Sequence, residues 1–228
     1  MTTNLLNLLH LSDPTLPIGG FSHSYGLETY SLKEIVKSPE EVEVFLIETL
    51  KNNILPNDAS FVSLIYDACE EANWLEILAL DELSHASKIP MEIRRASQKL
   101  GIRLLKIFTP LIQTPLVEEM AETIKKKETY GHYCTTYALC AHQLNIEKKE
   151  ALSGFFYNSA IGYITNAVKL IPLGQDIGQK ILFKLLPLME ELTNEAMTPN
   201  RQTLGISSMG FDIRAMEHEN LYSRQYMS

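Results

Sequence analysis

The chain has 228 residues, of which 45% are hydrophobic and 21% are charged. That length suits a single domain, and the mean hydropathy of -0.05 excludes both an integral membrane protein and a wholly disordered chain. The net charge is -8, and a surface of that sign repels phosphate backbones unless basic groups cluster locally. We therefore do not expect nucleic acid as a partner.

Cysteine usage and the N-terminal residues indicate where the protein works. Cys69, Cys134 and Cys140 form an odd set with no CxxC spacing, which is typical of a reducing compartment. No positively charged region precedes the first apolar residues, so no secretory signal is predicted. Every apolar stretch is interrupted well before the roughly 18 residues that a membrane-spanning helix needs. The sequence predicts a cytoplasmic protein with no membrane contact.

Apolar residues recur at three- and four-residue steps between the prolines and glycines, which predicts an all-α fold. The clearest helix start is Ser38-Pro39-Glu40-Glu41, a capping box with a proline in the first turn. We expect a single-domain helical bundle over residues 1–197 and a C-terminal interaction tail over residues 198–228. Helices are predicted at residues 39–52, from Pro56 through Cys69, and at 74–86, 90–108, 116–126, 132–144, 148–171 and 175–197, the last kinked at Pro187.

The predicted helix at residues 148–171 has almost no polar face. A helix that is apolar nearly all round belongs at the centre of a bundle or in an interface between subunits. We therefore expect this segment to supply the core or the contact between two copies of the chain.

Two segments fall outside the helical pattern. Residues 13–28 contain two prolines, three glycines and two aromatic residues, and residues 198–228 are rich in the aromatic, methionine and arginine residues that occur in protein interfaces. In the second of these segments, the C-terminal tail, so many apolar residues left in water would promote aggregation. Docking onto the chain's own core and binding to a partner both explain this composition, and the residues alone do not choose between them.

Sites for phosphate and for nucleophilic catalysis are not supported. Gly19-Gly20 precedes a predicted helix whose N-terminus could hold an anion, but GxGxxG and Gly-Lys-Ser/Thr are both absent. A structural turn is the favoured interpretation. His23 lies between two serines, yet no third orienting group or oxyanion signature accompanies it. We predict no catalytic residue and no cofactor.

A metal site is suggested by His132-x-Cys134 and Cys140-x-His142. On one helix these four side chains point in different directions, because each residue advances about 100° around the axis. They cannot converge on one ion, although a subset could meet ligands from elsewhere. Buried cysteines and hydrogen-bonded histidines are the favoured interpretation, and no metal site is predicted.

Arg95, Lys99, Arg103 and Lys106 are spaced by four, four and three residues, which places them in one basic stripe on the predicted helix at residues 90–108. A solvated outer face is the favoured interpretation, and a docking surface for an acidic partner is the alternative. Association that is sensitive to salt would support docking.

Four stretches of the sequence resemble the urease accessory protein UreF family. They lie at residues 16–28 (LPIGGFSHSYGLE), 90–103 (PMEIRRASQKLGIR), 171–180 (IPLGQDIGQK) and 216–228 (MEHENLYSRQYMS). The likeness extends over nearly the whole chain, and the order of the four stretches is specific.

The resemblance implies an all-helical homodimer, not itself an enzyme, that bridges the accessory protein UreD (also called UreH) and the GTPase UreG. That complex inserts nickel into the urease apoprotein, and the adaptor positions the GTPase and modulates its GTP cycle. The tail would become ordered against UreD/UreH, while Phe21 and Arg224 would support assembly with the GTPase. The partner-binding residues expected in the two segments are Phe21, His23, Tyr25, Glu219, Leu221, Tyr222, Arg224, Tyr226 and Met227.

Two alternatives compete with an adaptor. One is a helical small-molecule-binding enzyme with its pocket near residues 19–23. The other is a metal-storing chaperone that would lose nickel when His132 and Cys134 are replaced.

Overall fold

The computed structural model describes residues 2–228, and these form helices with no strand, as the sequence predicts. None of the helices in this part of the chain has the length and apolarity needed to cross a bilayer. The elements are α1 (Thr2–Leu11), η1 (Gly20–Ser22), α2 (Leu27–Leu32), α3 (Pro39–Thr49), η2 (Leu50–Ala59), α4 (Ser60–Glu70), α5 (Trp74–Ser87), α6 (Met91–Ile112), α7 (Pro115–Lys125), α8 (Tyr133–Gln143), α9 (Lys148–Leu170), α10 (Gln175–Ala196) and α11 (Met209–His218).

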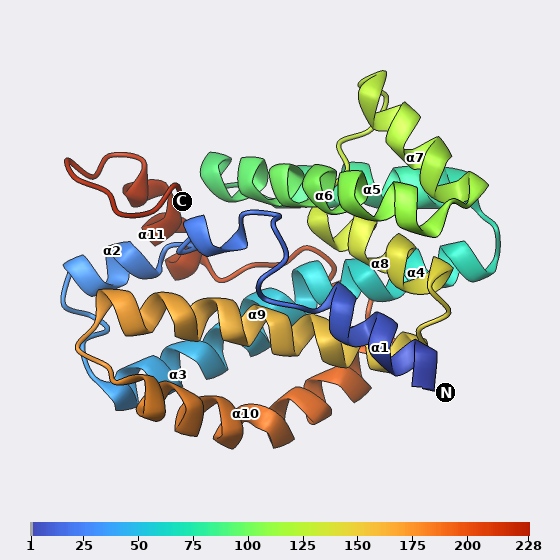
Figure 1. Cartoon of the computed structure of the whole chain (residues 1–228). Coiled ribbons are helices and arrows are strands. Elements are labelled where there is room, and N and C mark those ends of the chain that lie inside the picture. The colour runs from blue at the N-terminus through green and yellow to red at the C-terminus, as the bar shows by residue number, and fades with distance from the viewer. Residues whose placement is uncertain (1) are drawn as a thin grey trace.

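Helix α9 lies at the centre of the fold. It packs against α10 along one side and also contacts α1, α2, α4 and α8. Figure 1 shows it crossing the middle of the molecule, with α10 on one side and the layer that contains α6 on the other. Phe155, Phe156, Ala160 and Ile164 are buried along its length. Much of the apolar surface of residues 148–171 is therefore used in the core of this chain, while Tyr157 stays exposed.

The start of α3 has the predicted capping box. The Ser38 hydroxyl accepts a hydrogen bond from the Glu41 N–H at 3.3 Å, and the Glu41 carboxylate accepts one from the Ser38 N–H at 3.1 Å. Two N–H groups that no helical carbonyl can reach are thereby satisfied. Pro39, at the first helical position, costs no hydrogen bond there.

The predicted helix start at Pro56 is wrong. Residues Leu50–Ala59 form η2, a π-helical segment that joins α3 to α4 with no break. A proline inside an α-helix clashes with the carbonyl four residues earlier and lacks an N–H. The wider π turn, whose hydrogen bonds span five residues, accommodates the ring. The Ser60 hydroxyl donates to the Leu55 carbonyl at 2.7 Å just beyond it.

Three other features of the helices differ from the prediction. Helix α6 extends past Phe108 to Ile112, with Pro110 in its last turn. Helix α10 contains Pro187 without interruption and is bowed in Figure 1. Residues 198–228, for which no helix is predicted, contain α11. The sequence pattern misses this helix because serines and glycines precede its short apolar face.

Asp81 fixes the start of α8 from outside that helix. Its buried carboxylate accepts hydrogen bonds from the three consecutive N–H groups of residues 130–132 at 2.8–2.9 Å. It also accepts from the hydroxyls of Thr129, at 2.7 Å, and Thr135, at 2.6 Å. Burial by itself would raise the pKa of Asp81, but these hydrogen bonds and the neighbouring His132 outweigh it and lower the pKa.

We expect Asp81→Ala to lower the free energy of unfolding by about 3 kcal/mol, because several buried donors lose their acceptor together. Chemical denaturation followed by circular dichroism measures the change. Glu122→Ala, which removes an exposed pair with Lys125, is the control and should shift stability by less than about 0.5 kcal/mol. Equal stability of the two variants would contradict the role of Asp81.

Candidate functional site: the docked C-terminal tail

Residues 13–28, which we call the Gly-Gly segment, are pinned to α6 by Arg103. The guanidinium donates to the Ile18 carbonyl at 3.1 Å and lies directly over Gly19. Gly19 has a φ of 89°, which favours glycine, and a Cβ there would collide with the guanidinium. Gly19 therefore serves a turn, as expected, and also a close packing contact, and Phe21 follows on the surface.

The end of the tail docks onto the Gly-Gly segment. The main-chain oxygen of Ser228 accepts hydrogen bonds from the N–H groups of Ser24, at 2.6 Å, and Tyr25, at 3.1 Å, and from the Ser24 hydroxyl at 2.7 Å. The Ser228 hydroxyl lies 2.9 Å from Nδ1 of His23. The Met227 N–H donates to the Ser22 carbonyl at 2.8 Å. The two segments that fall outside the helical pattern are thus neighbours.

Two carboxylates hold the middle of the tail. Glu28, on α2, is only 4% exposed and accepts from the N–H groups of Gln225, at 2.6 Å, and Tyr226, at 3.1 Å. Glu92, on α6, accepts from the Arg224 guanidinium at 2.6 Å. One carboxylate comes from each side of the tail, so both α2 and α6 position it.

His218, near the end of α11, links these two carboxylates. Its ring is fully buried, with Nε2 2.9 Å from Glu28 and Nδ1 2.6 Å from Glu92. Each of the two ring nitrogens therefore has a carboxylate oxygen within hydrogen-bonding distance. The ring thus ties α11 to α2 and α6 in one buried polar cluster, in which each buried polar group has a partner.

His23 has the opposite electrostatic environment. Burial lowers its pKa to about 4, and the positive charges of Lys99 and Arg103 act in the same direction, while Glu92 opposes them. The ring is therefore neutral at pH 7 and can share a hydrogen bond with the Ser228 hydroxyl.

The structure divides the predicted partner-binding residues into exposed and buried groups. Phe21 is 68% exposed and Met227 is 56% exposed, and Tyr222 is fully exposed. Glu219, Leu221, Tyr25 and Arg224 are partly or largely exposed, whereas His23 and Tyr226 are buried. The last two serve the docking of the tail in this conformation, and they could touch a partner only if the tail moved. The Tyr226 hydroxyl has no hydrogen-bond partner among the described residues.

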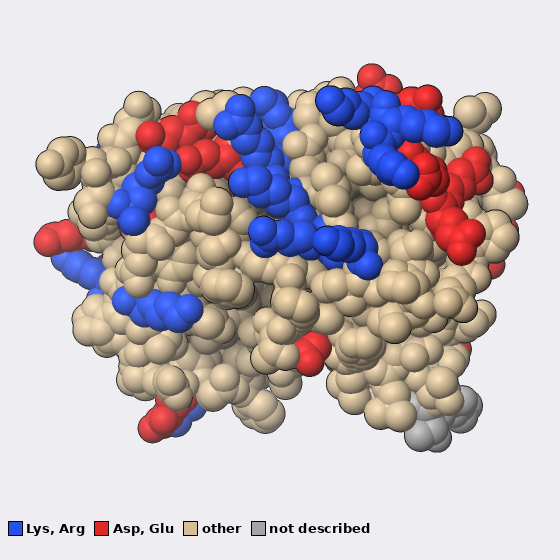
Figure 2. Space-filling view, turned by 45° about the horizontal axis from the view of Figure 1, so that its top comes forward, with Lys and Arg blue, Asp and Glu red and all other residues tan. Residues whose placement is uncertain are grey.

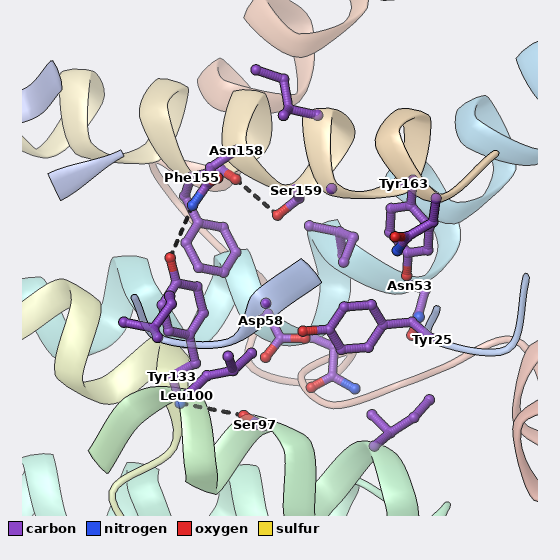
Figure 3. Close-up of a pocket in the computed structure, with 18 of the residues that line it drawn as sticks. Tyr25, Asn53, Asp58, Ser97, Leu100, Tyr133, Phe155, Asn158, Ser159 and Tyr163 are labelled. Atoms are coloured by element: carbon purple, nitrogen blue, oxygen red, sulfur yellow. Dashed lines mark hydrogen bonds between the residues drawn. The ribbon is translucent and has the colours of Figure 1, made fainter. Parts of the chain in front are cut away.

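A cavity of about 170 Å³ lies beneath the Gly-Gly segment and is lined in part by Gly20, Phe21 and Tyr25. Figure 3 shows the Tyr25 hydroxyl pointing toward Asp58 across it, and Tyr133 bonded to Asn158 on the opposite side. The alternative prediction of a small-molecule-binding enzyme requires a pocket near residues 19–23, and a cavity lies at that place.

The chemistry of this cavity does not resemble an active site. Lys88 forms an ion pair with Asp58 at 3.0 Å; burial opposes its charge, but the Asp58 carboxylate outweighs that effect and raises the pKa of Lys88. Burial raises the pKa values of Tyr25 and Tyr133, so both phenols stay protonated. Burial likewise raises the pKa of the nearby Cys134 thiol to about 11, which leaves it a poor nucleophile.

His132, just before α8, and Cys134, in its first turn, have separate surroundings. His132 bonds to Ser97 and His85 through its two ring nitrogens, and Cys134 contacts Ser84. No group of three or more potential ligands that could hold a metal ion occurs among residues 2–228.

Comparisons with known proteins agree with the sequence resemblance. The family model described as UreF matches residues 36–186. The chain is 43% identical over 221 residues to a urease accessory protein UreF from Actinobacillus pleuropneumoniae, covering 97% of each chain. It is 42% identical over 226 residues to one from Haemophilus influenzae strain PittEE, covering 99% of this chain and 96% of the relative. A UreF from Bacillus sp. strain TB-90 is 32% identical over 224 residues, covering 98% of this chain and 99% of that protein.

The chain belongs to the UreF family. The family match spans α3 to α10, and the pairwise matches also include the Gly-Gly segment and the tail. The docked tail described above is therefore a feature of a UreF-family urease accessory protein.

Sequence reasoning on the UreF-type motifs missed Glu28, Glu92 and His218 as site residues. All three lie inside the stretches that carry the resemblance, but no spacing relates positions 28, 92 and 218 to one another. One signal in the sequence could have identified these residues: the segments that are notable for aromatic residues and glycines also contain ionisable residues.

We expect Glu28→Gln to loosen the end of the tail while α11 stays folded, because the Gln225 and Tyr226 N–H groups lose a charged acceptor. Hydrogen–deuterium exchange of residues 221–228 should become at least tenfold faster. Glu217→Gln, on the exposed side of α11, is the matched control and should leave exchange of these amides unchanged. Unchanged exchange in both variants would contradict the role of Glu28.

The His23 ring predicts a loss of stability in acid. Above pH 6.5 it is neutral in both the folded and unfolded states, whereas below pH 6.5 only the unfolded chain binds the proton, until the folded pKa of about 4 is reached. The free energy of unfolding should fall by up to about 3 kcal/mol over this window. His23→Asn should show a shallower fall in denaturation measured from pH 7 to 4, and Phe21→Leu, in the same segment, should retain the parent slope.

Proposed function

We propose that this UreF-family protein is a non-catalytic adaptor in nickel delivery to urease. It bridges a UreD/UreH-type accessory protein and a UreG-type GTPase, with the urease apoprotein as the final recipient, and it works in the cytoplasm as a homodimer. The observation that carries the proposal is the meeting of the Gly-Gly segment and the tail, which places exposed Phe21, Tyr222 and Met227 at one end of the molecule.

The hydrogen bonds around Glu28 and Glu92 support this role. They hold a tail that would otherwise sample many conformations, so a partner that recognises it loses less conformational freedom on binding. Exposed tyrosine, phenylalanine and arginine are also the side chains that contribute most to binding energy in protein interfaces. We propose that the tail contacts the UreD/UreH-type partner and that Phe21 and Arg224 support capture of the GTPase, modulating its GTP cycle.

A small-molecule-binding enzyme is a weaker proposal for the same end of the chain. Its cavity exists, but the ion pair of Lys88 with Asp58 and the protonated phenols of Tyr25 and Tyr133 offer no activated acid, base or nucleophile. The adaptor accounts for the exposed aromatic residues, which a buried pocket does not.

We expect Arg224→Ala to weaken binding of the GTPase in the presence of the UreD/UreH-type partner by about 30-fold, the equivalent of about 2 kcal/mol for an arginine anchor. Pull-down and biolayer interferometry measure the loss, and an unchanged circular dichroism spectrum excludes unfolding. Glu92→Gln is the matched control, because it removes the ion pair but keeps the Arg224 side chain.

A direct contact by Arg224 predicts that Glu92→Gln retains most of the affinity. Equal loss in the two variants would show that binding depends on the contacts of Glu92 with Arg224 and His218, which hold the tail, and not on a direct contact of Arg224. Full affinity in Arg224→Ala would contradict the assignment of this residue to the interface.

A further inference from the structure

Helix α6 carries a basic stripe, Arg95, Lys99, Arg103 and Lys106, on its outer face. All four side chains are exposed and share an arc of about 80° over a length of about 16 Å. Figure 2 shows basic side chains gathered in a continuous band on the face of the molecule to which α6 contributes. The stripe is thus a local positive surface on a chain with a net charge of -8.

The charges of this stripe are not neutralised within the chain. Among residues 2–228, Arg95, Lys99 and Lys106 have no ion pair, and Arg103 bonds to a main-chain carbonyl. The only carboxylate on α6 is that of Glu92, which is already engaged by His218 and Arg224. Like charges three and four residues apart repel each other and destabilise a helix. The fold therefore retains a repulsion that an external acidic surface would relieve.

Apolar side chains accompany the stripe. Ile102 is 44% exposed and projects within about 20° of Arg95 around the helix axis. Phe21 is 68% exposed and lies two residues from Gly19, over which Arg103 packs. A surface that combines cations with an exposed isoleucine and phenylalanine suits a protein interface, because nucleic acid contacts are formed largely with phosphates.

We propose that the α6 stripe docks an acidic face of a protein partner whose apolar centre receives Ile102 and Phe21. This inference rests on the proposed adaptor function and adds the location and the charge of one partner footprint. The surface is continuous with the Gly-Gly segment and with Arg224, which pairs with the first turn of α6. The footprint thus extends from the tail along the helix.

A charge-reversal variant tests the proposal in the full chain. The test variant is Arg95→Glu/Lys99→Glu/Lys106→Glu, which leaves Arg103 in place because it holds the Gly-Gly segment. The matched control is Lys125→Glu/Lys126→Glu/Lys127→Glu, an equal charge change at the exposed end of α7. Circular dichroism melting confirms that both are folded. The probes are the UreD/UreH-type protein, the UreG-type GTPase and a 20-base-pair DNA duplex, each measured at 50 and 300 mM NaCl.

We expect the test variant to bind at least one of the two proteins tenfold or more weakly at 50 mM NaCl, with a smaller dependence on salt, while the control stays within twofold of the parent. If the parent binds its partners and both variants bind equally well, the stripe is not a docking surface and the adaptor proposal stands. If the parent binds neither protein, both proposals fail. Binding of the duplex that only the test variant loses would assign the stripe to nucleic acid and overturn the inference.

Discussion

The buried contact between Glu28, His218 and Glu92 is the constraint on which the functional end of this molecule depends. It joins α2, α6 and α11, and the same carboxylates also hold the backbone and the arginine of the tail. Each carboxylate would be costly to bury without partners, and the imidazole nitrogens and the donors of the tail supply those partners. The packing of α2, α6 and α11 therefore also sets the position of the tail.

This coupling explains why buried and exposed residues alternate along the tail. Tyr226 and Ser228 face inward and bond or pack against the Gly-Gly segment, while Tyr222 and Met227 face outward. The contacts of Tyr226 and Ser228 therefore determine where the exposed side chains of Tyr222 and Met227 lie. The composition of the tail has two explanations, docking onto the chain's own core and binding to a partner. The two are compatible, because different side chains of the tail are buried and exposed.

Most helices and the central position of α9 could be predicted from the sequence, because capping boxes and apolar spacing are local signals. Pro56 was misread because local rules assume α-helical hydrogen bonding, which η2 does not follow. The contact of Glu28 with His218 could not be predicted, because 190 residues separate them and only the tertiary fold brings them together. Exposed Phe21 was identified through the family resemblance, and its location beside α6 required the structure.

The π-helical segment η2 sets the rotational phase between α3 and α4. Phe45 in α3 and Phe61 in α4 both reach the core across it. Loss or gain of one residue between 50 and 59 would turn α4 by roughly 100° relative to α3 and carry Asp67, which pairs with Lys148 at the surface, toward the interior. The number of residues in this stretch is thus as important to the fold as its buried side chains are.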